Sequence, residues 1–306
     1  MITSLFGKSK PFNFLILGFV LTVALLWSQL RYTEDTDFTF FSNTFFSAFL
    51  LFFCLWLLEF ITYKNRLTQN NHFALFFFVC YLIGVMHLNI EPDAIWPLIF
   101  VVLAVRRILA FRTTVDFRQK IFDAAFWLTV GMFFNFWIIL FFVLLYLALL
   151  DFNGAPSRLW LIPLIASFSV LFPVFAYCFL FDKIDHFTNF FTIDTTNYSV
   201  IWMNHKTFWF MVITFCMALF SLYFYVKKLK LKASNQKKTR QHIVVGYFIS
   251  LAVYFLSHQV HPDVILLMVP FLSVLSVVFV EDYKKKLMLE SYLFLILIGM
   301  IGLVFW

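Results

Sequence analysis

Runs of apolar residues long enough to cross a bilayer recur along this chain, and short segments between them hold nearly all of its charge. A helix needs about 20 such residues, within a range of about 17 to 25, to span the roughly 30 Å hydrocarbon core. Inside that core every backbone polar group must be bonded within the protein, which a helix achieves within one segment. The pattern therefore predicts an all-α, polytopic transmembrane helix bundle, formed as a single integral membrane domain over residues 1–306.

The composition argues against a soluble domain, a disulfide-stabilised fold, a zinc site and a nucleic-acid partner. Only 13% of the residues are charged, whereas soluble domains carry roughly 25%. The four cysteines lie inside apolar runs and form no CxxC pair, so the sequence predicts neither a disulfide framework nor a zinc site. The net charge of +7 resides in short loops, where basic residues orient membrane proteins. We therefore expect the lipid bilayer, and no nucleic acid, as a partner.

Eleven apolar segments are candidate spans. Two of them, near 121–151, read either as a tight hairpin or as one long helix, and this choice sets the direction of every later span. We expect about eleven spans, near residues 12–30, 38–62, 72–88, 94–111, 121–134, 137–151, 159–181, 206–226, 242–257, 263–280 and 288–305.

The positions of lysine and arginine decide between the hairpin and the single helix. With two spans, every basic residue except Arg31, Lys183 and Lys206 falls on the same side as the N-terminus. With one span, the basic block at 227–240 would face outward, against the tendency of basic loops to remain in the cytoplasm. The sequence thus predicts two spans there and a cytoplasmic N-terminus.

An acidic motif follows the first predicted span. Glu34, Asp35 and Asp37 lie within four residues, and neighbouring carboxylates raise one another's pKa unless a cation neutralises them. Oxygen ligands of this kind can hold a divalent cation that binds substrate phosphate, and a carboxylate can also act as a general base. The same residues are compatible with a solvated acidic loop.

Histidines collect on the same predicted external face. His258 and His261 are three residues apart and Asp263 follows, with Pro262 expected to break the helix there. Together with His87, in the external turn near residue 90, these groups are candidates for binding a metal or a lipid phosphate, or for relaying protons. The alternative is that they hydrate the helix ends.

A few ionisable groups fall inside predicted spans, where they are costly and are candidates for function. Arg106 and Arg107 lie near the end of one span, and Asp123 lies near the start of the next. We expect pairing between an arginine and Asp123, rather than transport, because the middles of the spans are nearly free of charge.

Two resemblances follow from these residues. The stretch 120–125, the segment 133–136 at the hairpin tip, and the opening 1–6 with Lys8-Ser9-Lys10-Pro11 resemble a family of uncharacterised polytopic inner-membrane proteins of Bacteroidota. The layout as a whole also resembles GT-C-type glycosyltransferases and polysaccharide polymerases, which are multi-spanning enzymes with an acidic motif in the first external loop. This resemblance implies a substrate sugar linked to polyprenyl phosphate, with catalytic or metal-binding roles for Glu34, Asp35 and Asp37.

We therefore expect a multi-pass protein of the bacterial inner membrane that acts as a cell-envelope glycosyltransferase-like or polymerase-like enzyme at the outer face. In that scheme Arg31 or the external histidines would offset the phosphate charge of the substrate. Two alternatives remain open from the sequence. One is a non-catalytic subunit that packs against other membrane subunits, and the other is a transporter of a small solute or a lipid.

Overall fold

The computed structural model describes residues 2–32, 37–113, 115–152, 156–189, 205–229, 234–257, 262–283 and 286–305. These residues form helices joined by turns, with no strand among them. The elements in chain order are α1 (Ile2–Phe6), α2 (Pro11–Tyr32), α3 (Phe38–Asn65), α4 (Phe73–Val85), α5 (Pro92–Leu109), η1 (Ala110–Arg112), α6 (Phe117–Met132), η2 (Phe136–Leu140), α7 (Phe141–Leu150), η3 (Ser157–Leu161), α8 (Ile162–Leu180), α9 (Ile184–Asn189), α10 (His205–Leu229), α11 (Ser234–Leu256), α12 (Pro262–Leu266), α13 (Val269–Asp282) and α14 (Lys286–Phe305).

The all-helical class and the multi-pass membrane character are confirmed. Within the described chain, seven helical segments are long and apolar enough to cross a membrane: Pro11–Arg31, Phe38–Asn65, Pro92–Arg112, Ser157–Leu180, His205–Lys227, Pro262–Glu281 and Leu287–Val304. The other four expected spans also form helices, but α4 has 13 residues, α6 has 16, Phe136–Leu150 has 15, and α11 starts with a polar stretch. A helix of 13 residues is only about 20 Å long, which is short of a full hydrocarbon core.

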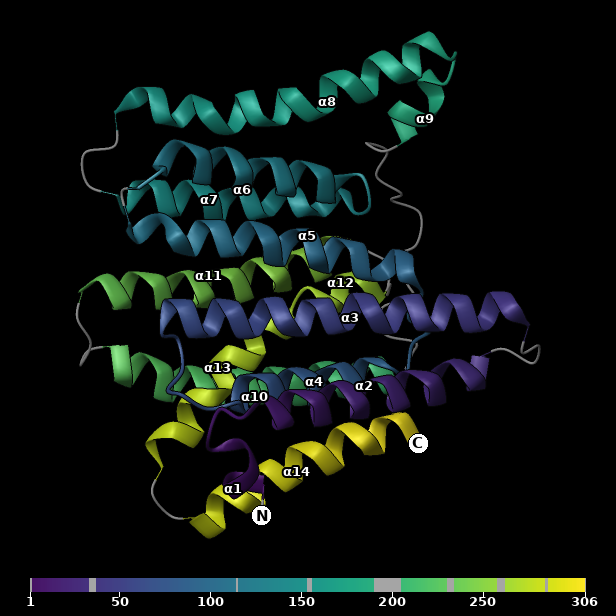
Figure 1. Ribbon diagram of the computed structural model, residues 1–306. Coiled ribbons are helices and arrows are strands. Elements are labelled where there is room, and N and C mark those ends of the chain that lie inside the picture. Colours follow the sequence, from purple (N-terminus) through teal and green to yellow (C-terminus); the bar gives the residue numbers. More distant parts are fainter. Residues whose placement is uncertain are drawn as a thin grey trace.

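The long helices lie side by side (Figure 1). Helices α4 and α13 pack against each other and are surrounded by α2, α3, α10, α11 and α14. Every residue of α4 is buried, and so is 94% of the most apolar window in Pro262–Glu281. A helix that is apolar on all sides is expected at such a central position. Tyr81 of α4 and Ser276 of α13 join the two through a hydrogen bond of 2.7 Å between their hydroxyl groups. The centre of the bundle is therefore filled by side chains.

The segment near 121–151 is a hairpin, as the basic residues predicted. Helix α6 ends at Met132, and Asn135 is extended, with its side-chain oxygen accepting a hydrogen bond of 2.9 Å from the Trp137 backbone N–H. Gly131 permits the close return, because a Cβ there would lie 3.1 Å from Ile138 and 3.2 Å from Phe100. The turn between α6 and η2 therefore depends on Gly131 and Asn135.

Two ends of the bundle differ in charge. We call the end that carries Lys64, Arg107, Arg112 and Lys238 the basic end. The opposite end, which carries Asp37, Asp93 and Asp263 together with Arg31, we call the acidic end. Because successive long helices run in opposite directions, α2 ends at the acidic end whereas α5 ends at the basic end (Figure 1).

Candidate functional site

The predicted intramembrane groups meet at the basic end. Arg107 of α5 and Asp123 of α6 form an ion pair with 2.8 Å between Nη2 and Oδ2. The Arg106 guanidinium lies over the ring of Phe60 of α3, 4.5 Å from its centroid. Cations also interact favourably with the C-terminus of a helix, where both arginines lie. These contacts join α3, α5 and α6, so the three charged residues act as a structural connection.

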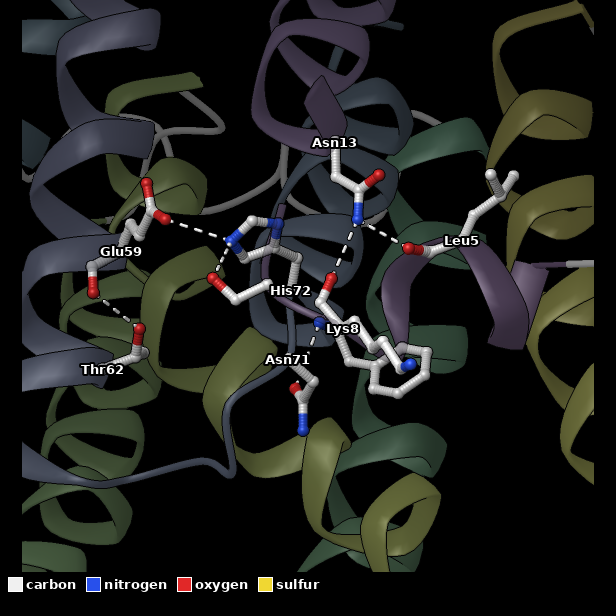
Figure 2. Close-up of polar contacts among 9 residues, drawn as sticks. Leu5, Lys8, Asn13, Glu59, Thr62, Asn71 and His72 are labelled. Atoms are coloured by element: carbon white, nitrogen blue, oxygen red, sulfur yellow. Dashed lines mark hydrogen bonds and ion pairs between the residues drawn. The ribbon is translucent and has the colours of Figure 1, made fainter. Parts of the chain in front are cut away.

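A second polar cluster at the basic end connects α1, α3 and the turn before α4 (Figure 2). The Nε2 atom of His72 lies 3.1 Å from a carboxylate oxygen of Glu59 and 3.0 Å from the Ser9 hydroxyl. The His72 backbone N–H donates to the Phe6 carbonyl at 3.0 Å, and Asn13 donates from α2 to the Leu5 carbonyl at 2.6 Å. The cluster fixes the N-terminal segment against the bundle.

Glu59, His72 and Ser9 are the residue types of a carboxylate–histidine–hydroxyl relay that activates a nucleophile, but their geometry differs from that of a relay. In a relay the carboxylate and the hydroxyl bond opposite nitrogens of the imidazole, so that a proton can pass through the ring. Here both contact Nε2, and the buried Nδ1 has no hydrogen-bond partner among the described residues. His72 was not among the predicted site residues, although the polar run Asn70-Asn71-His72 before an apolar helix was a usable signal.

At the acidic end, part of the predicted site lies outside the described residues. This applies to Glu34 and Asp35 of the acidic motif and to His258 and His261. Asp37 is described: it is exposed and occupies the N-cap position of α3 without a side-chain capping bond. Helix α11 ends at Leu256 and α12 begins at Pro262, in agreement with the expected break.

The other predicted groups at this end contact different partners. Asp263 accepts a hydrogen bond of 2.7 Å from Asn135, which ties the start of α12 to the hairpin tip. His87 is buried, with Nδ1 2.6 Å from the Gly84 carbonyl and Nε2 3.0 Å from the Thr207 hydroxyl. His87 therefore connects α4 to α10 inside the protein, and its ring does not point to open solvent.

A large apolar groove lies at the side of the bundle, between α2 and α3. It has a volume of about 840 Å³, and its described lining includes no ionisable side chain. Its wall on α3 begins at Phe38, the residue after Asp37. We call it the α2–α3 groove, lined by Leu15, Gly18, Phe19, Thr22, Leu26, Phe38, Phe41, Ser42, Thr44, Phe45, Ala48, Phe49 and Phe52.

A second apolar groove runs along the other side of α2. It has a volume of about 400 Å³. We call it the α2–α14 groove, lined by Phe19, Val20, Val23, Ala24, Trp27, Ile83, Met86, Ile301 and Val304.

A cation lies at the acidic end of the α2–α14 groove. The guanidinium of Arg31 lies 5.6 Å from the ring centroid of Trp27 and donates a hydrogen bond to the Val304 carbonyl. Both Trp27 and Val304 line the groove, and the Arg31 side chain is exposed. An apolar groove that ends at an exposed arginine suits both the hydrocarbon chain and the phosphate of a lipid phosphate, because guanidinium binds phosphate oxygens well.

The described residues contain no group of three or more histidine, cysteine, aspartate or glutamate side chains that could hold a metal ion. Comparisons of the chain with protein-family models, with curated proteins and with solved structures give no match.

Proposed function

We propose that this protein crosses the bacterial inner membrane about eleven times, with its N-terminus and the basic end in the cytoplasm. The seven long apolar helices support the membrane assignment, and the basic residues support the direction. The shorter helix α4 lies inside the bundle, where neighbouring helices cover it, whereas α7 is buried on one face and exposed on the other. With this orientation the acidic end and Arg31 face outward.

We further propose that the protein binds a polyprenyl-phosphate-linked sugar along α2 and acts on it as an envelope glycosyltransferase-like or polymerase-like enzyme. The observation that carries this proposal is the position of Arg31 at the end of the α2–α14 groove. In the proposed complex, the isoprenoid chain lies in the α2–α14 groove, which is open to the bilayer. The phosphate binds Arg31 at the interface between membrane and water. Each buried CH₂ of such a chain contributes about 0.8 kcal/mol to binding.

The acidic motif supplies the base in this scheme. The acceptor hydroxyl attacks the anomeric carbon of the donor sugar, the bond to the lipid phosphate breaks, and the hydroxyl proton passes to Glu34, Asp35 or Asp37. Asp37 is exposed beside the mouth of the α2–α3 groove, within one residue of its lining.

The alternatives have less support. A transporter needs a path through the protein, whereas the described centre around α4 and α13 is filled by buried side chains. A non-catalytic subunit needs a face for its partner. Helix α8 presents a broad apolar face, since only 22% of the most apolar window in Ser157–Leu180 is buried, but bilayer lipid covers such a face equally well.

The test is a binding titration of the purified protein in detergent with polyprenyl phosphate and with the uncharged polyprenol. We expect Arg31→Gln to weaken binding of the phosphate by roughly tenfold to a hundredfold, the range for a lost hydrogen bond to a charged group, and to leave polyprenol binding unchanged. Lys183→Gln is the matched control, because Lys183 is an exposed cation expected on the same face. Equal binding of both lipids by the unmodified protein, or no effect of Arg31→Gln, would refute the proposal.

A further inference from the structure

A separate cavity of about 260 Å³ lies at the basic end, where α5 with η1, α7 and α11 meet. Its polar wall consists of Arg112, Asp151, Lys238, Thr239 and His242. Apolar side chains of α5, η1 and α7, with Phe152, form the remainder. The ends of these helices lie together at one end of the bundle (Figure 1), opposite the end that carries Arg31. This cavity is thus distinct from both grooves along α2.

The two cations in the wall are held in place by backbone carbonyl groups. Arg112 donates from Nη2 to the Lys64 carbonyl at 3.0 Å, and the Lys238 ammonium donates to the Asp151 carbonyl. A guanidinium carries five donors and an ammonium three, so each retains donors for a ligand after these bonds. Both side chains are therefore oriented before a ligand binds, which lowers the entropic cost of binding.

The charge of the wall favours an anion. Two fixed cations outnumber the one carboxylate, Asp151, whose Oδ2 lies 3.4 Å from Nε2 of the buried His242. The apolar half of the wall suits the glycerol and the first carbons of an acyl chain. Basic pockets between membrane helices on the cytoplasmic side are the kind of site that binds anionic lipid headgroups.

We propose that this cavity binds a phosphate group through Arg112 and Lys238, with an anionic phospholipid of the cytoplasmic leaflet or free phosphate as its source. The site does not depend on the enzyme assignment, because it uses neither groove along α2 and none of the residues of the acidic motif.

The experiment uses the full chain in detergent with Arg31→Gln as background, so that phosphate binding at the acidic end is weakened. The probes are short-chain phosphatidylglycerol, short-chain phosphatidylcholine and inorganic phosphate. We expect phosphatidylglycerol to bind, and the pair Arg112→Gln and Lys238→Gln to weaken that binding by roughly tenfold to a hundredfold. The matched controls Arg118→Gln and Lys237→Gln remove exposed cations nearby that do not line the cavity, and they should leave the affinity unchanged.

A variant that is expected to increase the affinity distinguishes a lost binding site from a misfolded protein. Asp151→Asn removes the one carboxylate but retains the backbone carbonyl that accepts from Lys238, so the anion should bind more tightly. Competition by inorganic phosphate at equal affinity would identify free phosphate as the ligand, and its failure to compete would identify the lipid. If Arg112→Gln with Lys238→Gln binds phosphatidylglycerol as the background does, if the controls lose as much affinity, or if Asp151→Asn weakens binding, the proposal is wrong.

Discussion

The two ends of the bundle are stabilised in different ways. At the basic end, charged side chains connect separate helices through the Glu59–His72 contact, the Arg107–Asp123 pair and the bond of 2.7 Å from buried Arg240 to the Leu67 carbonyl. At the acidic end, α2 is flanked by two apolar grooves, and the exposed carboxylate Asp37 lies beside one of them. The charged contacts at the basic end thus connect helices, whereas the acidic end retains open apolar surface beside Asp37 and Arg31.

Charged residues therefore have two separate roles in this protein. At the basic end, Arg107, Arg112 and Arg240 connect separate parts of the chain through contacts inside the protein. Where a cation lies at the end of an apolar groove, as Arg31 does, it has exposed surface for a ligand. Mutations at the two ends should consequently change different measurable quantities.

The largest expected effect is at the acidic end. Replacing Glu34 and Asp35 with Gln and Asn, together with Asp37→Asn, removes the charge but nearly preserves the size of each side chain. Loss of a positioned base lowers a rate by about 10²- to 10⁴-fold, so the envelope glycan or glycolipid made by cells with this variant should fall accordingly. The amount of inserted protein should not change, because surface substitutions usually alter stability by less than about 0.5 kcal/mol.

The control for that experiment is Asp93→Asn, which removes an exposed carboxylate elsewhere at the acidic end. A triple variant with normal abundance and a normal glycan profile would assign the motif to a solvated loop. The non-catalytic subunit would then become the better description.

At the basic end we expect a loss of stability instead. His72→Ala removes a buried ring that contacts Glu59 and Ser9, and bonds to a charged group are typically worth about 1.5 to 3 kcal/mol. A thermal melt of the protein in detergent should show a lower Tm, and His205→Ala, which truncates an exposed histidine, should not. An unchanged Tm for His72→Ala would mean that the cluster does not hold the N-terminal segment in place.

The smallest effect is expected for the Arg107–Asp123 pair. Their side chains are 40% and 32% exposed, so solvent screens the attraction, and such pairs are worth at most about 1 kcal/mol. A double-mutant cycle with Arg107→Gln and Asp123→Asn should give a coupling energy in that range. A coupling above about 3 kcal/mol would indicate a desolvated pair and would reopen a functional role for it.

The sequence predicted the helices better than the contacts between them. Apolar length located the long helices, Pro262 indicated the break between α11 and α12, and the basic residues predicted the hairpin near Asn135. These features depend on local chemistry. Sequence analysis also placed Arg31 among the phosphate-binding candidates from its position after the first span.

Long-range partners were not predictable in the same way. Arg31 bonds the carbonyl of Val304, and His87, expected in an external turn, is buried against Thr207 of α10. No local pattern encodes which helices become neighbours. The two grooves along α2 are also a property of packing, because they depend on how closely α3 and α14 approach that helix.

In the proposed topology, the two ends of the bundle lie on opposite sides of the membrane, with the acidic end outside. The most direct test is labelling of intact cells with an impermeant thiol reagent, in a background in which Cys54, Cys80, Cys178 and Cys216 are replaced by Ala. We predict that Asp93→Cys, exposed at the acidic end, reacts from outside, and that Lys237→Cys, exposed at the basic end, reacts only after permeabilisation. Labelling of Lys237→Cys in intact cells, with protection of Asp93→Cys, would contradict the account.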